Sequence, residues 1–188
     1  MDFNKYIAVI QDYPKKGISF KDVTPLLNDG EAFKACIKEF SDFATSVGAT
    51  VIVGPEARGF LFGTPVAYNL GLGFVPVRKP NKLPRETVSY SYELEYGTDE
   101  LHIHKDAIKK GDKVVIIDDL IAVGGTIDAT IKLVEMLGGE VVGVACVIVL
   151  EELPGYKNIS SKYPLKTLLK LSDKEQYEFK ISISKTYI

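Results

Sequence analysis

The sequence predicts an α/β fold, in which a mostly parallel, twisted sheet is wrapped by helices and carries an antiparallel hairpin flap and a small hood. Apolar runs rich in β-branched residues, such as residues 114–117, alternate with amphipathic helical segments, as in sheets covered on both faces. Glycine-bearing loops separate several strands from the helices that follow them. Residues 88–103 instead alternate apolar and polar side chains, which indicates a hairpin.

Composition favours a globular protein with one substantial core. The chain has 188 residues, of which 46% are hydrophobic, so we expect a single domain over residues 1–188, with a hood from the N-terminal segment and the region after residue 150. The formal net charge of -2 argues against nucleic-acid binding. No signal peptide and no membrane span are expected, and Cys36 and Cys146 fit buried free thiols, so we expect a cytoplasmic protein.

The elements before and after the centre of the chain follow a regular order. Residues 12–27 contain prolines and glycine and predict an ordered loop packed on the body. The tail alternates apolar and polar residues over residues 177–183, which predicts an edge strand. The other expected elements are helix 30–47, strand 50–53, helix 60–70, strand 74–77, hairpin 88–103, strand 141–150 and strand 165–171.

The central stretch, residues 113–137, predicts a ligand site. The buried strand 114–117 is followed at once by Asp118 and Asp119, at the carboxyl end of a strand, where α/β sheets bind ligands. A small-residue loop at residues 122–126 then opens onto a helix from Ile127, and such a helix start binds phosphate. Carboxylates beside a phosphate site fit a sugar phosphate, because they accept hydrogen bonds from its hydroxyls. The alternative is a structural turn with incidental aspartates.

Two further loops carry candidate ligand-binding cations, and one carries an aromatic residue. Arg58, in the loop at residues 54–59, could bind a pyrophosphate or could be an exposed surface arginine. The basic loop at residues 78–84 follows a strand and would face the same crevice, although such loops are commonly just solvated. Phe20 could belong to the core or could stack on a flat base.

Five short sequence motifs occur together in one known family. DYPKKGISFKDVTPLL, GPEARGFLFG, VRKPNKLP, SYELEYG and VVIIDDLIAVGGT resemble, in this order, the adenine-specific branch of the type I phosphoribosyltransferases. The resemblance covers approximately residues 12–171, and nothing is transferred to the tail from Ser172. It implies transfer of 5-phosphoribosyl from 5-phospho-α-D-ribose 1-diphosphate to N9 of adenine, giving AMP and pyrophosphate. It also implies Mg²⁺ and a homodimer.

The resemblance also implies roles for single residues. Glu95 of the flap would manage the proton of the purine, and the Glu56–Ala57 peptide would be cis. Mg²⁺ would be held through the diphosphate and the ribose hydroxyls, with no direct protein ligand. The remaining implied roles are pyrophosphate and catalysis for Arg58; the diphosphate for Arg78, Lys79 and Lys82; the ribose hydroxyls for Asp118 and Asp119; the 5-phosphate for Ala122, Val123, Gly124, Gly125 and Thr126; and the base for Ser19, Phe20, Lys21 and Leu153.

One departure and two alternatives remain. The family usually has Thr where this chain has Val123, so we expect a weaker grip on the sugar phosphate, because a hydroxyl that could donate to phosphate is missing. An enzyme of the same fold acting on a 6-oxopurine is the first alternative, because base selectivity can come from main-chain contacts. The second is a non-catalytic regulator that binds the sugar diphosphate, although the chain lacks the length and the basic patch of a DNA-binding domain.

Overall fold

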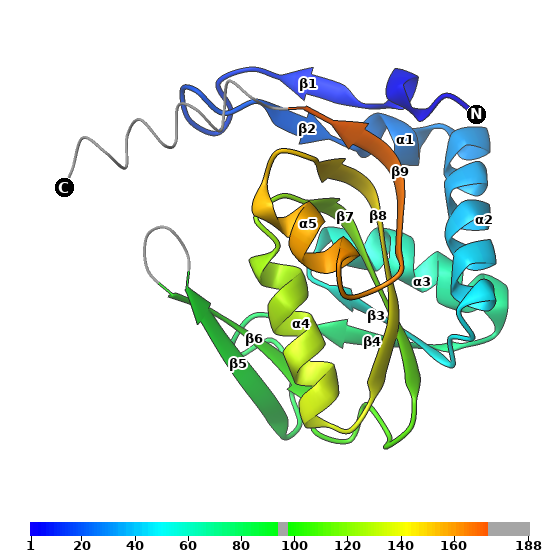
Figure 1. The fold of residues 1–188 in the computed structure, drawn as a ribbon, viewed down its shortest axis with the longest axis vertical. Coiled ribbons are helices and arrows are strands. Elements are labelled where there is room, and N and C mark those ends of the chain that lie inside the picture. Colours follow the sequence, from blue (N-terminus) through cyan, green and yellow to red (C-terminus); the bar gives the residue numbers. More distant parts are fainter. Residues whose placement is uncertain (94–97, 173–188) are drawn as a thin grey trace.

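The computed structural model describes residues 1–93 and 98–172 (Figure 1). Its centre is a five-stranded parallel sheet with the strand order β4-β3-β7-β8-β9. The α/β architecture expected from the sequence is therefore confirmed. The strands are β3 (Val51–Pro55), β4 (Gly73–Val77), β7 (Lys113–Ile121), β8 (Glu140–Leu150) and β9 (Leu165–Leu171).

Alternating side chains of the central strands fill two separate hydrophobic cores. In β7, Val115 and Ile117 enter the cluster that contains residues of α2 (Gly30–Ser46) and α3 (Arg58–Leu70). Val114 and Ile116 enter the other cluster, with residues of α4 (Gly125–Met136). Because successive side chains of a strand point to opposite faces, helices cover both faces of the sheet, which explains the unbroken apolar runs.

Two antiparallel strand pairs complete the fold. β5 (Thr87–Glu93) and β6 (Thr98–His104) form the hairpin that the alternating pattern predicts, and it lies beside α4 in Figure 1. β1 (Ala8–Ile10) pairs with β2 (Phe20–Asp22). The short elements are η1 (Phe3–Tyr6), α1 (Thr24–Asn28) and α5 (Pro154–Ser160), and η1 contacts both α1 and β9.

Three expectations need correction. The segment at residues 12–27 contains β2 and α1 rather than only a loop, because strand pairing fixes Phe20–Asp22 and Pro25 is tolerated in the first turn of a helix. β7 does not end at Ile117 but continues through both aspartates, with Asp118 opposite Cys146 of β8. Helix α4 begins at Gly125, two residues earlier than expected.

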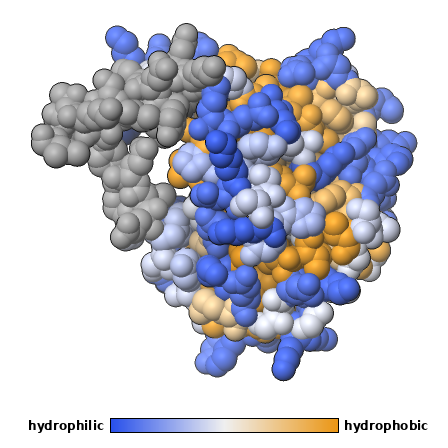
Figure 2. All heavy atoms as spheres, viewed as in Figure 1, coloured by the Kyte–Doolittle hydropathy of each residue, from blue (hydrophilic) through white to orange (hydrophobic). Residues whose placement is uncertain are grey.

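The position of the last described strand bears on the predicted hood. β9 belongs to the main sheet, next to β8, so the region after residue 150 also extends the central layer. One domain with a hood stays a prediction, and the strand expected at residues 177–183 lies outside the described residues. On the face shown in Figure 2, hydrophilic residues lie between and around the apolar ones. No helix of the described part is long and apolar enough to cross a membrane.

Candidate functional site

The predicted ligand-binding loops meet at one edge of the sheet. β3 lies between β4 and β7, and all three run parallel, so the loops that follow them are neighbours. The first loop carries Glu56 and leads to Arg58, the second begins with Arg78 and Lys79, and the third is residues 122–126. Open α/β sheets bind ligands at this edge.

The two aspartates are buried near the carboxyl end of β7. Asp118 is 8% exposed and Asp119 3% exposed, and Asp118 Oδ1 accepts a hydrogen bond of 2.9 Å from the Asp119 N–H. Burial raises the pKa of Asp118, and the neighbouring Asp119 carboxylate raises it further. Burial also raises the pKa of Asp119, against the opposing effect of the Arg58 guanidinium.

Asp119 keeps one oxygen without a hydrogen bond. Arg58 Nε lies 3.1 Å from Asp119 Oδ2 and forms an ion pair with it, but this buried oxygen accepts no hydrogen bond among the described residues. A buried acceptor without a donor is uncommon in folded proteins and costs free energy. The oxygen is therefore available to a donor such as a ligand hydroxyl.

A glycine that the sequence reasoning did not single out brings Arg58 to this aspartate. A Cβ atom at Gly59 would lie 2.9 Å from the Ile117 carbonyl oxygen and 3.3 Å from Asp118 Oδ1. Only a residue without a side chain allows the start of α3 to lie this close to β7. The glycine-flanked loop was visible in the sequence, but its partner was not.

Arg58 also contacts the predicted base-binding aromatic residue. Its Cζ atom lies 5.5 Å from the centroid of the Phe20 ring, and the Tyr13 ring meets Phe20 edge-on at 5.3 Å. Phe20 is partly exposed and belongs to neither hydrophobic core. On the same strand, Lys21 Nζ donates a hydrogen bond of 2.6 Å to Ser19 Oγ. Arg58 thus contacts both Phe20 and Asp119.

The glycine loop takes its shape from a second loop behind it. Gly124 has a φ of 96°, in the left-handed region that favours glycine. Gly155 N donates to the Ala122 carbonyl oxygen at 3.2 Å, and a Cβ at Gly155 would lie 2.4 Å from that oxygen. Leu153, which directly precedes α5, is buried. The predicted phosphate loop and the predicted base-binding Leu153 are therefore adjacent, while the Val123 side chain is 50% exposed.

The hairpin reaches the same loop through a tyrosine. A Cβ at Gly125 would lie 3.1 Å from the Tyr92 ring, and the Tyr92 hydroxyl lies 3.4 Å from Thr126 Oγ1. The Tyr92 hydroxyl also donates to Asp99 Oδ2 at 3.2 Å, and the same oxygen accepts from Lys79 Nζ. Burial raises the pKa of Tyr92. A continuous chain of contacts therefore joins Lys79 to Thr126.

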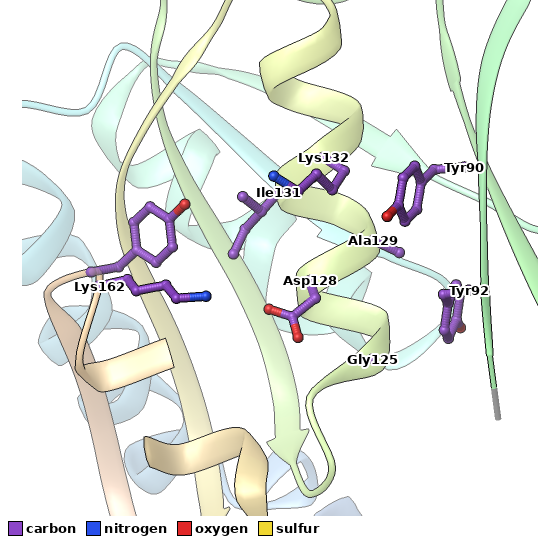
Figure 3. A pocket seen from close by; sticks show the side chains of 9 residues that line it. Tyr90, Tyr92, Gly125, Asp128, Ala129, Ile131, Lys132 and Lys162 are labelled. Carbon is purple, nitrogen blue, oxygen red and sulfur yellow. The ribbon is translucent and has the colours of Figure 1, made fainter. Parts of the chain in front are cut away.

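A cavity borders this contact on the outer side of α4. Its volume is about 390 Å³, and Figure 3 shows Tyr90 and Tyr92 on its hairpin side and Asp128 and Lys132 on its helix side. Lys162 lies on the opposite side from the tyrosines. Neither Asp118 nor Asp119 lines this cavity, so it is separate from the aspartate pair.

The basic loop is held by a carboxylate. Glu56 Oε2 accepts hydrogen bonds from Arg78 Nε at 2.8 Å and from the Lys79 backbone N–H at 3.2 Å. Arg78 Nη1 donates to the Lys82 carbonyl oxygen at 3.3 Å, and the Lys82 ammonium has no ion-pair partner within residues 1–93 and 98–172. The expected cis peptide between Glu56 and Ala57 is confirmed.

The structure leaves one predicted residue undescribed and adds others. Glu95 lies outside the described residues. The sequence reasoning missed Glu56 as a partner of the basic loop, Tyr92 and Asp99 as a link across the hairpin, and Gly155 as a support of the glycine loop. Glu56 and Tyr92 lie within the motifs that resemble the family, and this position could have identified them as site residues. Nothing in the sequence indicates that Asp99 or Gly155 contacts the site.

Comparisons with known proteins agree with this geometry. The model of the phosphoribosyl transferase domain family matches residues 27–185, so the match extends past the motifs and into the tail. The adenine phosphoribosyltransferase of Alkaliphilus metalliredigens is 56% identical over 170 residues, which cover 90% of this chain and 99% of that protein.

Solved structures give the same result. The crystal structure of adenine phosphoribosyltransferase from Thermoanaerobacter pseudethanolicus has a TM-score of 0.86 and 53% identity, covering 90% of this chain and 98% of that one. The enzyme of Saccharomyces cerevisiae, crystallised with an imino-altritol bisphosphate and adenine, has a TM-score of 0.83 and 38% identity, covering 89% and 96%. The chain belongs to the phosphoribosyltransferase family, among its adenine phosphoribosyltransferases.

Proposed function

We propose that the loops after β3, β4 and β7 form the site at which this chain transfers 5-phosphoribosyl from its 1-diphosphate to N9 of adenine. The products are AMP and pyrophosphate. The observation that carries the site assignment is the buried Asp119 oxygen that accepts no hydrogen bond, beside Arg58 and next to a glycine loop at a helix start. A pentose phosphate supplies what each of these groups lacks.

The sugar phosphate is bound by two kinds of group. Asp118 and Asp119 accept hydrogen bonds from the ribose hydroxyls, because ionised carboxylates are strong acceptors. Backbone N–H groups at the start of α4 and the Thr126 hydroxyl bind the 5-phosphate, which the positive end of the helix dipole also attracts. The loop members are Ala122, Val123, Gly124, Gly125 and Thr126.

Cations bind the diphosphate. Arg58 lies beside Asp119 and is half-exposed, so its guanidinium can bind the leaving pyrophosphate bidentately. Arg78, Lys79 and Lys82 supply further positive charge from the neighbouring loop. As the glycosidic bond to pyrophosphate breaks, negative charge grows on the leaving group, and fixed cations stabilise that charge most effectively where water is excluded.

The base lies between Phe20 and Leu153, and main-chain groups at Ser19 and Lys21 contact its amino edge. Adenine is favoured over a 6-oxopurine or a purely regulatory role, because the similar proteins are named as adenine enzymes and the yeast enzyme was crystallised with adenine. N9 attacks C1 of the ribose, the bond from C1 to the diphosphate oxygen breaks, and the N9 proton leaves to Glu95.

Mg²⁺, a homodimer and a cytoplasmic location are also proposed. The available donors are carboxylate oxygens, which suit Mg²⁺, and this ion is commonly bound by one or two carboxylates together with substrate phosphates. Within residues 1–93 and 98–172, no group of three His, Cys, Asp or Glu side chains could hold a metal directly. In this proposal Mg²⁺ would be held through the diphosphate and the ribose hydroxyls that Asp118 and Asp119 bind, and the ion would neutralise diphosphate charge.

The experiment is to incubate the protein with phosphoribosyl diphosphate, Mg²⁺ and one purine base at a time, and to identify the nucleotide by chromatography. We expect AMP from adenine and far slower reaction with hypoxanthine or guanine. IMP or GMP without AMP would select the 6-oxopurine alternative. Binding of phosphoribosyl diphosphate without any nucleotide formation would select the regulatory one. Asp119→Asn should abolish most AMP formation if the site is assigned correctly.

A further inference from the structure

Glu56 is a negatively charged residue where the proposed function requires positive charge. It follows β3 directly, two residues before Arg58, and its side chain is only 17% exposed. A carboxylate next to a diphosphate site weakens anion binding unless its charge is compensated. Its presence therefore needs a reason, and its contacts supply one.

A single oxygen of Glu56 connects the loops after β3 and β4. Glu56 Oε2 accepts from Arg78 Nε at 2.8 Å and from Lys79 N at 3.2 Å, and Glu56 N donates to the Val77 carbonyl oxygen at 2.8 Å. The Arg78 backbone is fixed separately by two hydrogen bonds with His102 of the hairpin, at 2.9 Å and 2.7 Å. Glu56 thus fixes the side chain of Arg78 and the backbone of Lys79.

The Arg78 guanidinium is oriented but not used up by these contacts. An arginine has five N–H donors. Arg78 gives one to Glu56 and one to the Lys82 carbonyl oxygen, and the other N–H groups have no partner in the described part of the chain. Its Cζ atom also lies 6.0 Å from the Phe60 ring centroid. The remaining donors are held in one orientation and stay available to an anion.

We infer that Glu56 is a positioning residue for diphosphate binding, which holds Arg78 and Lys79 in place for the leaving group of the proposed reaction. Without it, the Arg78 guanidinium would lose its ion pair, repel the neighbouring Lys82 ammonium and adopt more conformations with it, and the Lys79 backbone N–H would lose its acceptor, while Arg58 and the Lys79 ammonium would keep their pairs with Asp119 and Asp99. Binding would then have to restrict those side chains, which costs free energy for each one. The inference rests on the proposed function, because it assigns the anion that the basic loop receives.

The test compares Glu56→Ala and Glu56→Gln with the unsubstituted protein. Glu56→Ala removes both acceptor contacts, so the KM for phosphoribosyl diphosphate should rise about tenfold, as expected for the loss of a charge-assisted hydrogen bond. Glu56→Gln keeps a carbonyl oxygen that can accept both hydrogen bonds, so its KM should rise only about threefold. The KM for adenine and kcat should stay close to the unsubstituted values.

A matched control is available close by. Asp106 forms an exposed ion pair with Arg85, the residue that follows the basic loop, so Asp106→Ala also removes a carboxylate that pairs with an arginine but leaves the contacts of Glu56 in place. It should leave both KM values unchanged. Circular dichroism and thermal melts check the fold of each variant, and if Glu56→Ala does not fold, Glu56→Gln alone decides.

Three results would overturn the inference: an unchanged KM for phosphoribosyl diphosphate, an equal rise of both KM values, or a fall of kcat alone. Direct binding of pyrophosphate to the unsubstituted protein and to Glu56→Gln, measured by calorimetry, separates this inference from the proposed function. If the protein makes no AMP at all, the proposed function fails. Weaker pyrophosphate binding in the variant would still support the role of Glu56, and equal binding would refute it.

Discussion

Replacing Val123 by threonine should strengthen binding of phosphoribosyl diphosphate. Val123 lies in the glycine loop before α4, and its side chain is 50% exposed. Valine and threonine have nearly the same shape and are both branched at Cβ, so the substitution adds a hydroxyl donor without repacking. A hydrogen bond to a charged group contributes about 1.5–3 kcal/mol. Because the side chain is half in water, we expect the lower end, about 1.5 kcal/mol, or about a tenfold lower KM.

The assay is the initial rate of AMP formation at saturating adenine and varied phosphoribosyl diphosphate. KM equals the dissociation constant only where chemistry is slow, so calorimetric binding of the diphosphate should accompany it. Val123→Ala is the control, because it changes the packing without adding a donor. An unaltered KM and binding constant for Val123→Thr would refute the reasoning, and would mean that the loop N–H groups and Thr126 already satisfy the phosphate.

Three further predictions concern other parts of the site. Gly155→Ala would place a Cβ 2.4 Å from the Ala122 carbonyl oxygen. It should therefore lower the free energy of unfolding in urea by about 1–3 kcal/mol and raise the KM for phosphoribosyl diphosphate. If both quantities stayed unchanged, the contact would not have the role described. Phe20→Ala should raise the KM for adenine by about 1–3 kcal/mol in equivalent free energy, with Phe20→Leu intermediate; an unchanged KM would place the base elsewhere. Asp118→Asn should abolish most activity yet raise the melting temperature at neutral pH. Burial raises the pKa of Asp118 in the folded protein, so its ionisation destabilises the fold as the pH rises above the unfolded pKa, and the gain should disappear in acid, where the carboxyl is protonated; a gain that persists in acid would contradict this cause.

The sequence predicted the order of elements because hydrophobic periodicity reflects burial directly. The run at Val114–Ile117 is buried on both faces, as its composition indicates. The length of β7 was underestimated because Asp118 and Asp119 interrupt the apolar pattern. The backbone nevertheless continues its pairing with β8, where Leu120 faces Ile148. Polar residues at a strand end can belong to the strand when a site requires them there.

Contacts between distant segments were beyond the reach of periodicity. Glu56 and Arg78 are 22 residues apart, and only the parallel pairing of β3 with β4 places them side by side. The sequence around Gly155 shows only a glycine after a proline, and its close contact with Ala122 is visible only in the structure. The site residues that the sequence did predict lie in short motifs, and the order of these motifs along the chain is typical of one family.

The backing of the glycine loop by Gly155 has a consequence for transplanting this motif. The bend at Gly124 is set partly by a hydrogen bond from a segment about thirty residues further along, in addition to its own left-handed φ. A short synthetic peptide with the sequence AVGGT would lack that brace, and so would the same five residues grafted onto an unrelated scaffold. A designer who wants the geometry must carry both pieces of chain together.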